Sequence, residues 1–252
     1  MMSSKNKKSI TLEKILFSQG FGTRRYCSHL IMAELVQVNG EIIDDPEQLI
    51  STENLILSVE DQVWPFHEKA YLVFHKPPNY ECSHKTKHHP SVYNLLPAPL
   101  IERGIQCVGR LDQDTTGLLL LSDDGQFIHQ MTTPKKNIGK AYEITTAEPI
   151  TPHQIECLLK GVVLDDDPTP CLAIQCSQEG ERKVVMTIVE GRYHQVKRML
   201  VAVGNHVDKL HRRSIGNYHL PMSLKEGEWQ WLSPENINEL YGRITSLTTD
   251  ND

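Results

Sequence analysis

The sequence predicts an α+β protein in which a small module precedes a larger domain with a mixed, mainly antiparallel sheet. Segments that fit strands outnumber segments with helical spacing, and many are joined by short turns, which favours antiparallel pairing. The composition also changes near residues 61–68, where we expect a linker. The predicted parts are a tail (1–9), the module (10–60), the linker (61–68), the larger domain (69–242) and a second tail (243–252).

The charges of the chain are unevenly distributed. A formal net charge of −6 argues against a general nucleic-acid binder. Residues 5–29, however, contain six lysines and arginines against one glutamate, and residues 183–213 contain seven against two acids. A solvated helix face is the simplest explanation for either cluster alone. Two separate basic stretches on an acidic protein indicate a polyanion held in a groove.

The composition disfavours membrane and secreted proteins. No apolar run approaches the roughly 20 residues of a membrane span. The polar, lysine-bearing start of the sequence argues against a secretory signal. The six cysteines are scattered without a Cys-x-x-Cys pair, which predicts free thiols in a reducing compartment. We therefore expect a cytoplasmic, monomeric protein that does not contact membranes.

The module is expected to contain two short helices and a small sheet. Thr11 can cap the first helix and Gly20 can end it. Thr23 can cap the second helix, which buries its apolar residues and leaves Arg24 and Arg25 facing outward.

A hairpin and one further strand complete the module. Residues 36–43 predict the hairpin, because Asn39 and Gly40 supply the two positive-φ positions of a type I′ turn. Residues 55–59 are expected to add a strand to the same sheet.

Residues 108–125 organise the larger domain. Gly117 precedes four leucines and turn residues follow them, so a short buried strand fits this run better than a helix. Arg110, Asp112 and Asp114 crowd together just ahead of this strand, where an unpaired charge is costly. A carboxylate at the mouth of a buried sheet, with cations nearby, suits a nucleophile or general base. A capped, salt-bridged loop explains the same residues about equally well.

The rest of the larger domain alternates between strands and short helices. An apolar strand (71–74) is followed by a loop rich in cysteine and histidine (82–89). This loop matches no common zinc spacing, so we expect no metal and a polar loop near bound nucleic acid. The other expected elements are helices at 127–131, 152–160 and from 195 to Gly204, a loop at 165–170, and strands at 140–144, 171–176, 183–190, 207–213 and 229–232.

A second dense motif covers residues 190–200. Val196, Met199 and Leu200 have helical spacing, which places Lys197 near the start of a helix. A lysine there opposes the helix dipole. We therefore expect Lys197 to point at an acidic group.

The chain resembles a family of RNA-modifying enzymes in several motifs. Residues 109–112 (GRLD) with 116–121 (TGLLLL), 140–142 (KAY) and 190–199 (EGRYHQVKRM) resemble the RsuA-type pseudouridine synthases. The two helices and the Asn-Gly hairpin are similar to the S4-like RNA-binding module of that family, although the usual glycine before the hairpin strand is absent. Lysine after His-Gln-Val resembles the branch that acts on 16S ribosomal RNA. The resemblance covers nearly the whole chain.

The resemblance also implies roles for individual residues. Asp112 would be the nucleophile, adding to C6 of uracil or to C1′, and Lys197 would keep it ionised. Tyr142 and Leu210 would bracket the extruded base, while Arg110 would fill the gap that the base leaves. The remaining basic residues would contact phosphates: Arg24, Arg25, Arg192, Arg198, Arg212 and Arg213.

The implied reaction is an isomerisation of one specific uridine in 16S ribosomal RNA, either free or in a small-subunit assembly intermediate. It transfers neither electrons nor phosphate, so we expect no cofactor. A synthase acting on 23S ribosomal RNA is one alternative. A non-catalytic ribosome-assembly factor is another, but it leaves the carboxylate of Asp112 unexplained. A glycosidase-like hydrolase would need paired carboxylates in a cleft lined by aromatic side chains, and only Asp112 and Asp114 offer such a pair.

Overall fold

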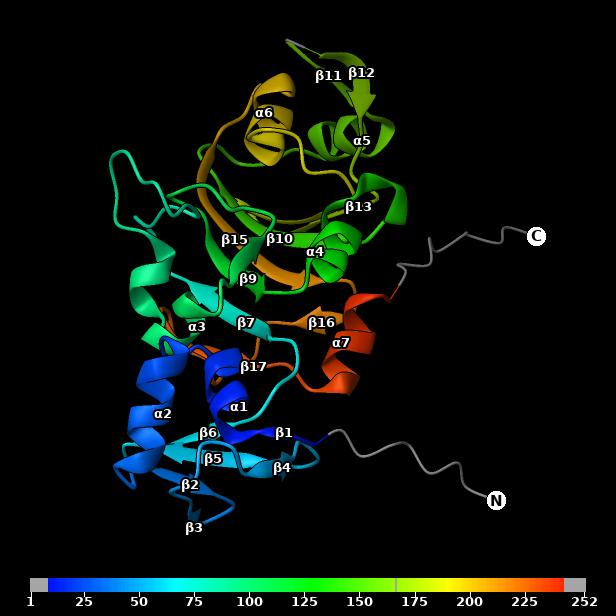
Figure 1. Ribbon diagram of the computed structural model, residues 1–252. Helices are drawn as coiled ribbons and strands as arrows, with labels where there is room; N and C mark the ends of the chain where they lie inside the picture. The colour runs from blue at the N-terminus through cyan, green and yellow to red at the C-terminus, as the bar shows by residue number, and fades with distance from the viewer. Residues whose placement is uncertain (1–8, 166, 243–252) are drawn as a thin grey trace, which may run out of the picture. The chain divides into compact units, whose positions relative to one another are not determined.

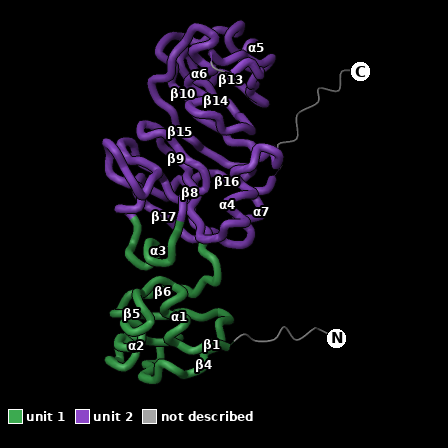
Figure 2. Tube along the Cα trace, turned by 45° about the horizontal axis from the view of Figure 1, so that its top comes forward, with its two compact units in different colours: residues 1–70, 96–105 green, residues 71–95, 106–252 purple. Residues whose placement is uncertain are grey.

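The computed structural model describes residues 9–165 and 167–242 and divides into two compact units (Figures 1 and 2). Unit 1 contains the residues up to 70 together with 96–105, and unit 2 contains 71–95 together with the residues from 106 onward. The two expected tails lie outside the described residues, except for Ser9, which begins a strand. No described helix has the length and apolar character needed to cross a membrane.

Unit 1 combines helices with a small antiparallel sheet. The sheet order is β3-β2-β5-β6, and β1 pairs separately with β4. Leu12, Leu16, Ile31 and Leu57 are fully buried between the helices and the sheet. The elements are β1 (Ser9–Thr11), α1 (Leu12–Gln19), α2 (Arg24–Met32), β2 (Val36–Val38), β3 (Glu41–Ile42), β4 (Leu49–Ser51), β5 (Ile56–Val59), β6 (Gln62–Pro65) and α3 (Ala98–Glu102).

Local sequence signals account for most of unit 1. The Thr23 hydroxyl accepts the expected capping hydrogen bond, and Asn39 and Gly40 have φ values of 51° and 90°, as a type I′ turn requires. Thr11 occupies the cap position of α1 but makes no side-chain capping bond, which corrects one expectation. The expected linker is also partly wrong, because Gln62–Pro65 pairs with β5 as an edge strand.

Unit 2 is built on a nine-stranded sheet. The main order is β13-β14-β10-β15-β9-β7-β17, with β16 paired to β15 and β8 paired to β9. All pairs are antiparallel except β9 with β15, so the predicted mixed, mainly antiparallel sheet is confirmed. Its strands are β7 (Tyr71–Lys76), β8 (Gln106–Val108), β9 (Thr116–Ser122), β10 (Lys140–Thr146), β13 (Gln175–Gly180), β14 (Lys183–Ile188), β15 (Val207–Ile215), β16 (Tyr218–His219) and β17 (Trp229–Trp231).

Helices and a separate hairpin surround this sheet (Figure 1). Phe127 and Met131 of α4 pack with Leu118, Leu120 and Leu240 in one apolar cluster. The hairpin of β11 and β12 replaces the loop expected at 165–170, and the chain leaves the hairpin before β13 begins, which breaks the strand expected at 171–176. The elements are η1 (Val92–Leu95), α4 (Gly125–Thr132), η2 (Pro134–Lys136), α5 (Pro152–Lys160), β11 (Val162–Leu164), β12 (Asp167–Cys171), α6 (Gln195–Ala202) and α7 (Pro234–Leu240).

The parallel pair of β9 and β15 lies at the centre of the sheet. Thr116 lies opposite His211 and Gly117 lies opposite Arg212. The four leucines after Gly117 are fully buried, as the sequence predicted. A Cβ atom on Gly117 would lie 2.3 Å from the carbonyl oxygen of Arg212, and its φ is 104°. Only glycine therefore allows β9 to approach β15 closely enough to form this pair.

Candidate active site

The loop between β8 and β9 carries Asp112, and a buried lysine donates hydrogen bonds to its backbone. Lys76, at the end of β7, has no exposed surface. Its ammonium group donates hydrogen bonds to the carbonyl oxygens of Pro77 (3.0 Å), Gln113 (3.0 Å) and Thr115 (2.9 Å). Burial lowers the pKa of Lys76. Three carbonyl acceptors offset part of the cost of burying the charge and fix the backbone on either side of Asp114.

Asp112 faces the start of helix α6. Its carboxylate lies 3.2 Å from the ammonium nitrogen of Lys197 and 3.4 Å from Nε2 of His194. The expected ion pair between Lys197 and Asp112 is therefore present. Lys197 also donates to both carboxylate oxygens of Asp114, at 2.7 and 2.9 Å, which the sequence did not predict. One lysine thus bridges two carboxylates of the same loop.

The ionisation of this cluster follows from its pairing. Burial favours the neutral form of Lys197, but hydrogen bonds and the charges of Asp114 and Asp112 outweigh it and raise its pKa overall. Burial likewise favours the neutral form of Asp114, but the hydrogen bond and charge of Lys197 lower its pKa overall. Lys197 therefore remains a cation across the neutral range.

Strands β10 and β15 form the opposite side of the site. Tyr142 lies opposite Arg212 in the antiparallel register, and Leu210 lies opposite Ile144. The three predicted residues on these strands, Tyr142, Leu210 and Arg212, all line one cavity. Tyr142 and Leu210 are each 7% exposed. Lys140, two residues before Tyr142, lines the same cavity. Burial, and then the charge of Arg212, lower the pKa of Lys140 to about 8.

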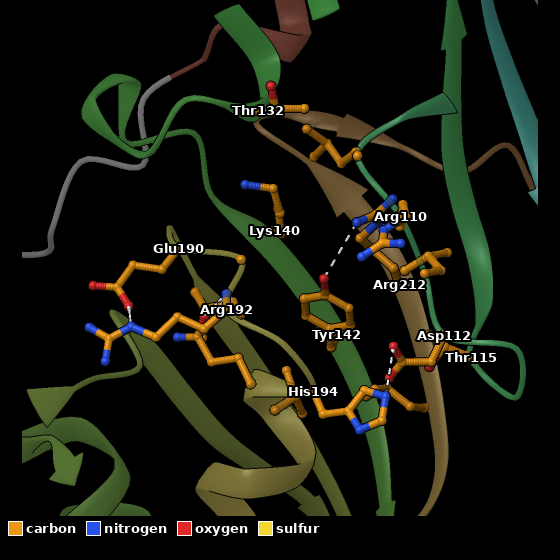
Figure 3. A pocket seen from close by; sticks show the side chains of 18 of the residues that line it. Arg110, Asp112, Thr115, Thr132, Lys140, Tyr142, Glu190, Arg192, His194 and Arg212 are labelled. Carbon is orange, nitrogen blue, oxygen red and sulfur yellow. Dashed lines mark hydrogen bonds and ion pairs between the residues drawn. The ribbon is translucent and has the colours of Figure 1, made fainter. Parts of the chain in front are cut away.

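These groups surround a cavity of about 500 Å³, a volume suited to a small organic group such as a nucleoside. In Figure 3 Asp112 and His194 face each other, and Tyr142 lies between them and Lys140. Arg110 is exposed and also lines the cavity. The cavity therefore brings together the carboxylates of Asp112 and Glu190, an aromatic ring, aliphatic side chains and several cations.

Three arginines expected at phosphates lie in different surroundings. Arg192 contacts Glu190 at 2.7 Å and Asp167 at 2.9 Å, so its charge is already neutralised by two carboxylates. Arg213 contacts Glu143 and Glu179, at 3.7 and 3.6 Å. Both guanidinium groups are therefore engaged by carboxylates in the free protein, and the phosphate contacts expected of these two arginines stay predictions.

Arg212 also differs from an exposed phosphate contact. It is 3% exposed, and its Nε donates to the carbonyl oxygen of Leu118 at 2.7 Å. Its Nη1 lies 3.4 Å from the hydroxyl of Tyr142, while its Nη2 is buried without a hydrogen-bond partner. Arg212 thus belongs to the wall of the cavity, with its guanidinium group largely buried.

The other expected basic residues occupy separate places. Arg198 donates to the backbone oxygen of Tyr193 at 3.1 Å and does not line the cavity. Arg24 and Arg25 are exposed on α2 of unit 1, and Arg24 lies 5.3 Å from the ring centroid of Phe17. Within the described residues, no group of three or more histidine, cysteine, aspartate or glutamate side chains is arranged to hold a metal.

Sequence reasoning missed Lys76, Lys140 and His194 as parts of the site. Lys76 ends an apolar strand, which could have indicated that its side chain is buried. A buried lysine needs hydrogen-bond acceptors, so it is expected to contact nearby carbonyl oxygens. Alternation along residues 140–144 places Lys140 on the same face as Tyr142. Nothing local in the sequence indicates that His194 reaches Asp112, since the two are brought together by the tertiary fold.

Comparisons with known proteins agree with this arrangement. Residues 70–202 match the RNA pseudouridylate synthase family, and residues 10–56 match the S4 domain. The ribosomal small subunit pseudouridine synthase A of Pasteurella multocida is 38% identical over 90% of this chain and 97% of its own length. The protein of the same name from Escherichia coli (strain K12) is 35% identical over 90% of this chain and 97% of its own length.

A solved structure shows the same fold. The crystal structure of a pseudouridylate synthase aligns with a TM-score of 0.65 and 36% sequence identity, and the alignment covers 92% of this chain and all of the other. The similarity thus extends through both matched regions.

Proposed function

Because the chain belongs to the RNA pseudouridylate synthase family, we propose that it converts a specific uridine of 16S ribosomal RNA to pseudouridine. The observation that carries this proposal is Asp112, an anionic side chain that pairs with Lys197 in a cavity that also contains Arg110, Lys140 and Arg212. In a site that only bound RNA, a carboxylate in this place would repel phosphates. As a nucleophile it has a use there.

The proposed reaction breaks the N1–C1′ bond of uridine and joins C5 of the base to C1′. The carboxylate of Asp112 forms a temporary covalent bond with the substrate, which holds the fragments while the base turns. The proton lost from C5 is balanced by the proton gained at N1. Nothing is oxidised or reduced, and the Asp112 carboxylate is regenerated. The chain's own side chains therefore suffice for the chemistry.

We assign positioning roles to the residues around Asp112. Lys197 orients the carboxylate and offsets its negative charge through their ion pair. Tyr142 stacks on the extruded uracil and is placed to accept the C5 proton, and Leu210 covers the opposite side of the base. Arg110 enters the RNA at the position that the flipped nucleotide leaves, because a base inside a helix is not accessible to side chains. Arg212 offers its free N–H groups to an oxygen of the bound nucleotide.

The remaining RNA contacts are assigned to unit 1 and to the rim of the site. Arg24 and Arg25 on α2 contact phosphates, as basic residues of an RNA-binding module do. The substrate is 16S ribosomal RNA or a small-subunit assembly intermediate, the enzyme acts as a monomer, and such a substrate places it in the cytoplasm.

The test is to map pseudouridine by mass shift in the ribosomal RNA of cells with and without this protein. The proposal expects one 16S position to lose its modification and to regain it when purified protein is added. A lost position in 23S RNA would instead identify the large-subunit activity. No lost position in either RNA would contradict the enzymatic proposal and favour an assembly factor.

A further inference from the structure

Tyr193 is the most exposed aromatic side chain in the described part of the chain, with 71% of its surface accessible. Single exposed aromatic residues are common on protein surfaces and need no explanation by themselves. The surroundings of Tyr193 are different from those of a scattered surface residue, because its ring is held in place and lies beside the cavity.

The ring of Tyr193 stacks on the ring of His194. The two centroids are 3.8 Å apart and the ring planes differ by 20°. His194 lines the cavity, and its Nε2 lies 3.4 Å from the carboxylate of Asp112. Only one ring thus separates Tyr193 from the nucleophile. One face of Tyr193 is covered by His194, and the high exposure leaves the other face open.

The backbone around this stack is strained and firmly held. His194 has φ 48° and ψ 33°, in the left-handed region that favours glycine, and its side chain makes no capping bond to α6. The turn is held by the hydrogen bond from Arg198 to the backbone oxygen of Tyr193 and by the bond from the backbone N–H of Arg192 to Gln195. Glycine at position 194 would relieve the strain but remove the ring. Strain that persists at a site is a reason to look for function there.

We propose that the open face of Tyr193 is a stacking subsite for the nucleobase next to the flipped uridine. This inference rests on the proposed function. Flipping a nucleotide removes the stacking partner of its neighbour, whose exposed face needs a new partner. Aromatic side chains provide such partners in single-stranded RNA, and they accept any base because every base has a π face. Because the stack is already ordered, little entropy is lost when a base joins it.

Binding to two single strands tests the subsite without requiring turnover. One probe is a fluorescein-labelled oligouridylate, and the other is the same sugar-phosphate strand without bases. Tyr193→Ala should weaken binding of the oligouridylate by about fivefold or more, because about fivefold is the lower end of what base–aromatic stacking contributes per base. It should leave binding of the abasic strand unchanged. Tyr193→Phe keeps the ring face and should bind both strands like the parent.

Met222→Ala, at a fully exposed residue of the same unit, is the matched control and should change neither affinity. Equal affinity of Tyr193→Ala and the parent for oligouridylate would overturn the inference. So would an equal loss for both strands, since that would indicate a contact to the backbone. Release of tritium from C5-labelled 16S transcript by the parent tests the proposed function separately. Its absence would contradict that function, and the two binding measurements would still decide whether Tyr193 stacks on a base.

Discussion

The two sides of the cavity handle their charges in opposite ways. The loop wall consists of Asp112, His194 and Lys197, and Lys197 contacts both Asp112 and Asp114, which does not line the cavity. The strand wall consists of Lys140, Tyr142, Leu210 and Arg212, and neither of its cations contacts a carboxylate among the described residues. The cation of the loop wall is therefore paired with carboxylates, whereas the cations of the strand wall have only carbonyl and hydroxyl acceptors.

Under the proposed function, this difference separates preparation of the nucleophile from recognition of the substrate. Paired charges on the loop wall keep Asp112 oriented before RNA binds, which lowers the reorganisation needed during the reaction. On the strand wall, Lys140 has a lowered pKa and Arg212 has an unpartnered N–H group. Such groups lower the free energy of unfolding of the free protein, and a hydrogen bond to an oxygen of the nucleotide would offset this loss in the complex.

Removing the cation of the loop wall should have the largest effect. In Lys197→Met the carboxylate of Asp112 loses a cation at 3.2 Å, and removing an opposite charge favours the neutral form of a carboxyl group. The acid limb of the pH–activity profile should therefore move to higher pH. The raised pKa of Lys197 means that this contribution is present throughout the neutral range and is lost only above about 10.5.

Steady-state tritium release measured across pH checks this prediction, and Lys197→Arg should keep part of the parent profile. Lys183→Met, on an exposed position of β14, is the control for a general loss of positive charge. An acid limb that stays in place in Lys197→Met would show that the ion pair has no part in activating Asp112.

Removing a cation from the strand wall should stabilise the free protein. The pKa of Lys140 is lowered from 10.5 to about 8, so the folded state disfavours its charged form. Lys140→Met should raise the free energy of unfolding at neutral pH, by up to about 3 kcal/mol. The parent gains stability relative to the variant as pH rises through about 8, and the gap stops changing above 10.5.

Urea unfolding over this pH range measures the gap, with Lys183→Met as the exposed control that should show little change. RNA affinity of Lys140→Met should fall, because the group that stabilises bound RNA is lost. A stability difference that is independent of pH, or a less stable variant, would show that the buried charge of Lys140 does not destabilise the free protein.

The smallest effect is expected at Asp114. Its carboxylate is paired with Lys197, but its side chain is 61% exposed, and an exposed pair contributes less than about 1 kcal/mol. Asp114→Asn should therefore leave the free energy of unfolding nearly unchanged and retain turnover at neutral pH. Urea unfolding and tritium release on the same preparation measure both. Loss of turnover would mean that Asp114, and not Asp112 alone, takes part in the reaction.

Elements with a strong local signal could be predicted from the sequence. The leucine run became the buried strand β9, residues 152–160 became α5, and the Asn-Gly pair formed its turn. Elements that depend on distant partners could not be predicted. The strand β6 forms because β5 offers an edge, and the hairpin of β11 and β12 has too little apolar alternation to be recognised in the sequence.

The residues of the site also divide into those that the sequence predicts and those that depend on the tertiary structure. Asp112 and Tyr142 lie in recognisable motifs and the family resemblance implies Leu210, and the structure places all three on one cavity. The partners of the arginines depend on tertiary structure, since Arg192 meets Asp167, which lies 25 positions earlier in the sequence. Charge clusters in a sequence therefore indicate that a polyanion binds, but they do not identify which cations remain free to bind it.

The central claim is that Asp112 is the nucleophile, and Asp112→Asn tests it most directly. This change keeps the size of the side chain and removes its charge. The measurement is release of tritium from C5-labelled 16S RNA, with RNA affinity at fixed salt determined on the same folded variant. The account predicts no release, together with affinity equal to or slightly above that of the parent, because one negative charge no longer faces the phosphates. Turnover near that of the parent would contradict it.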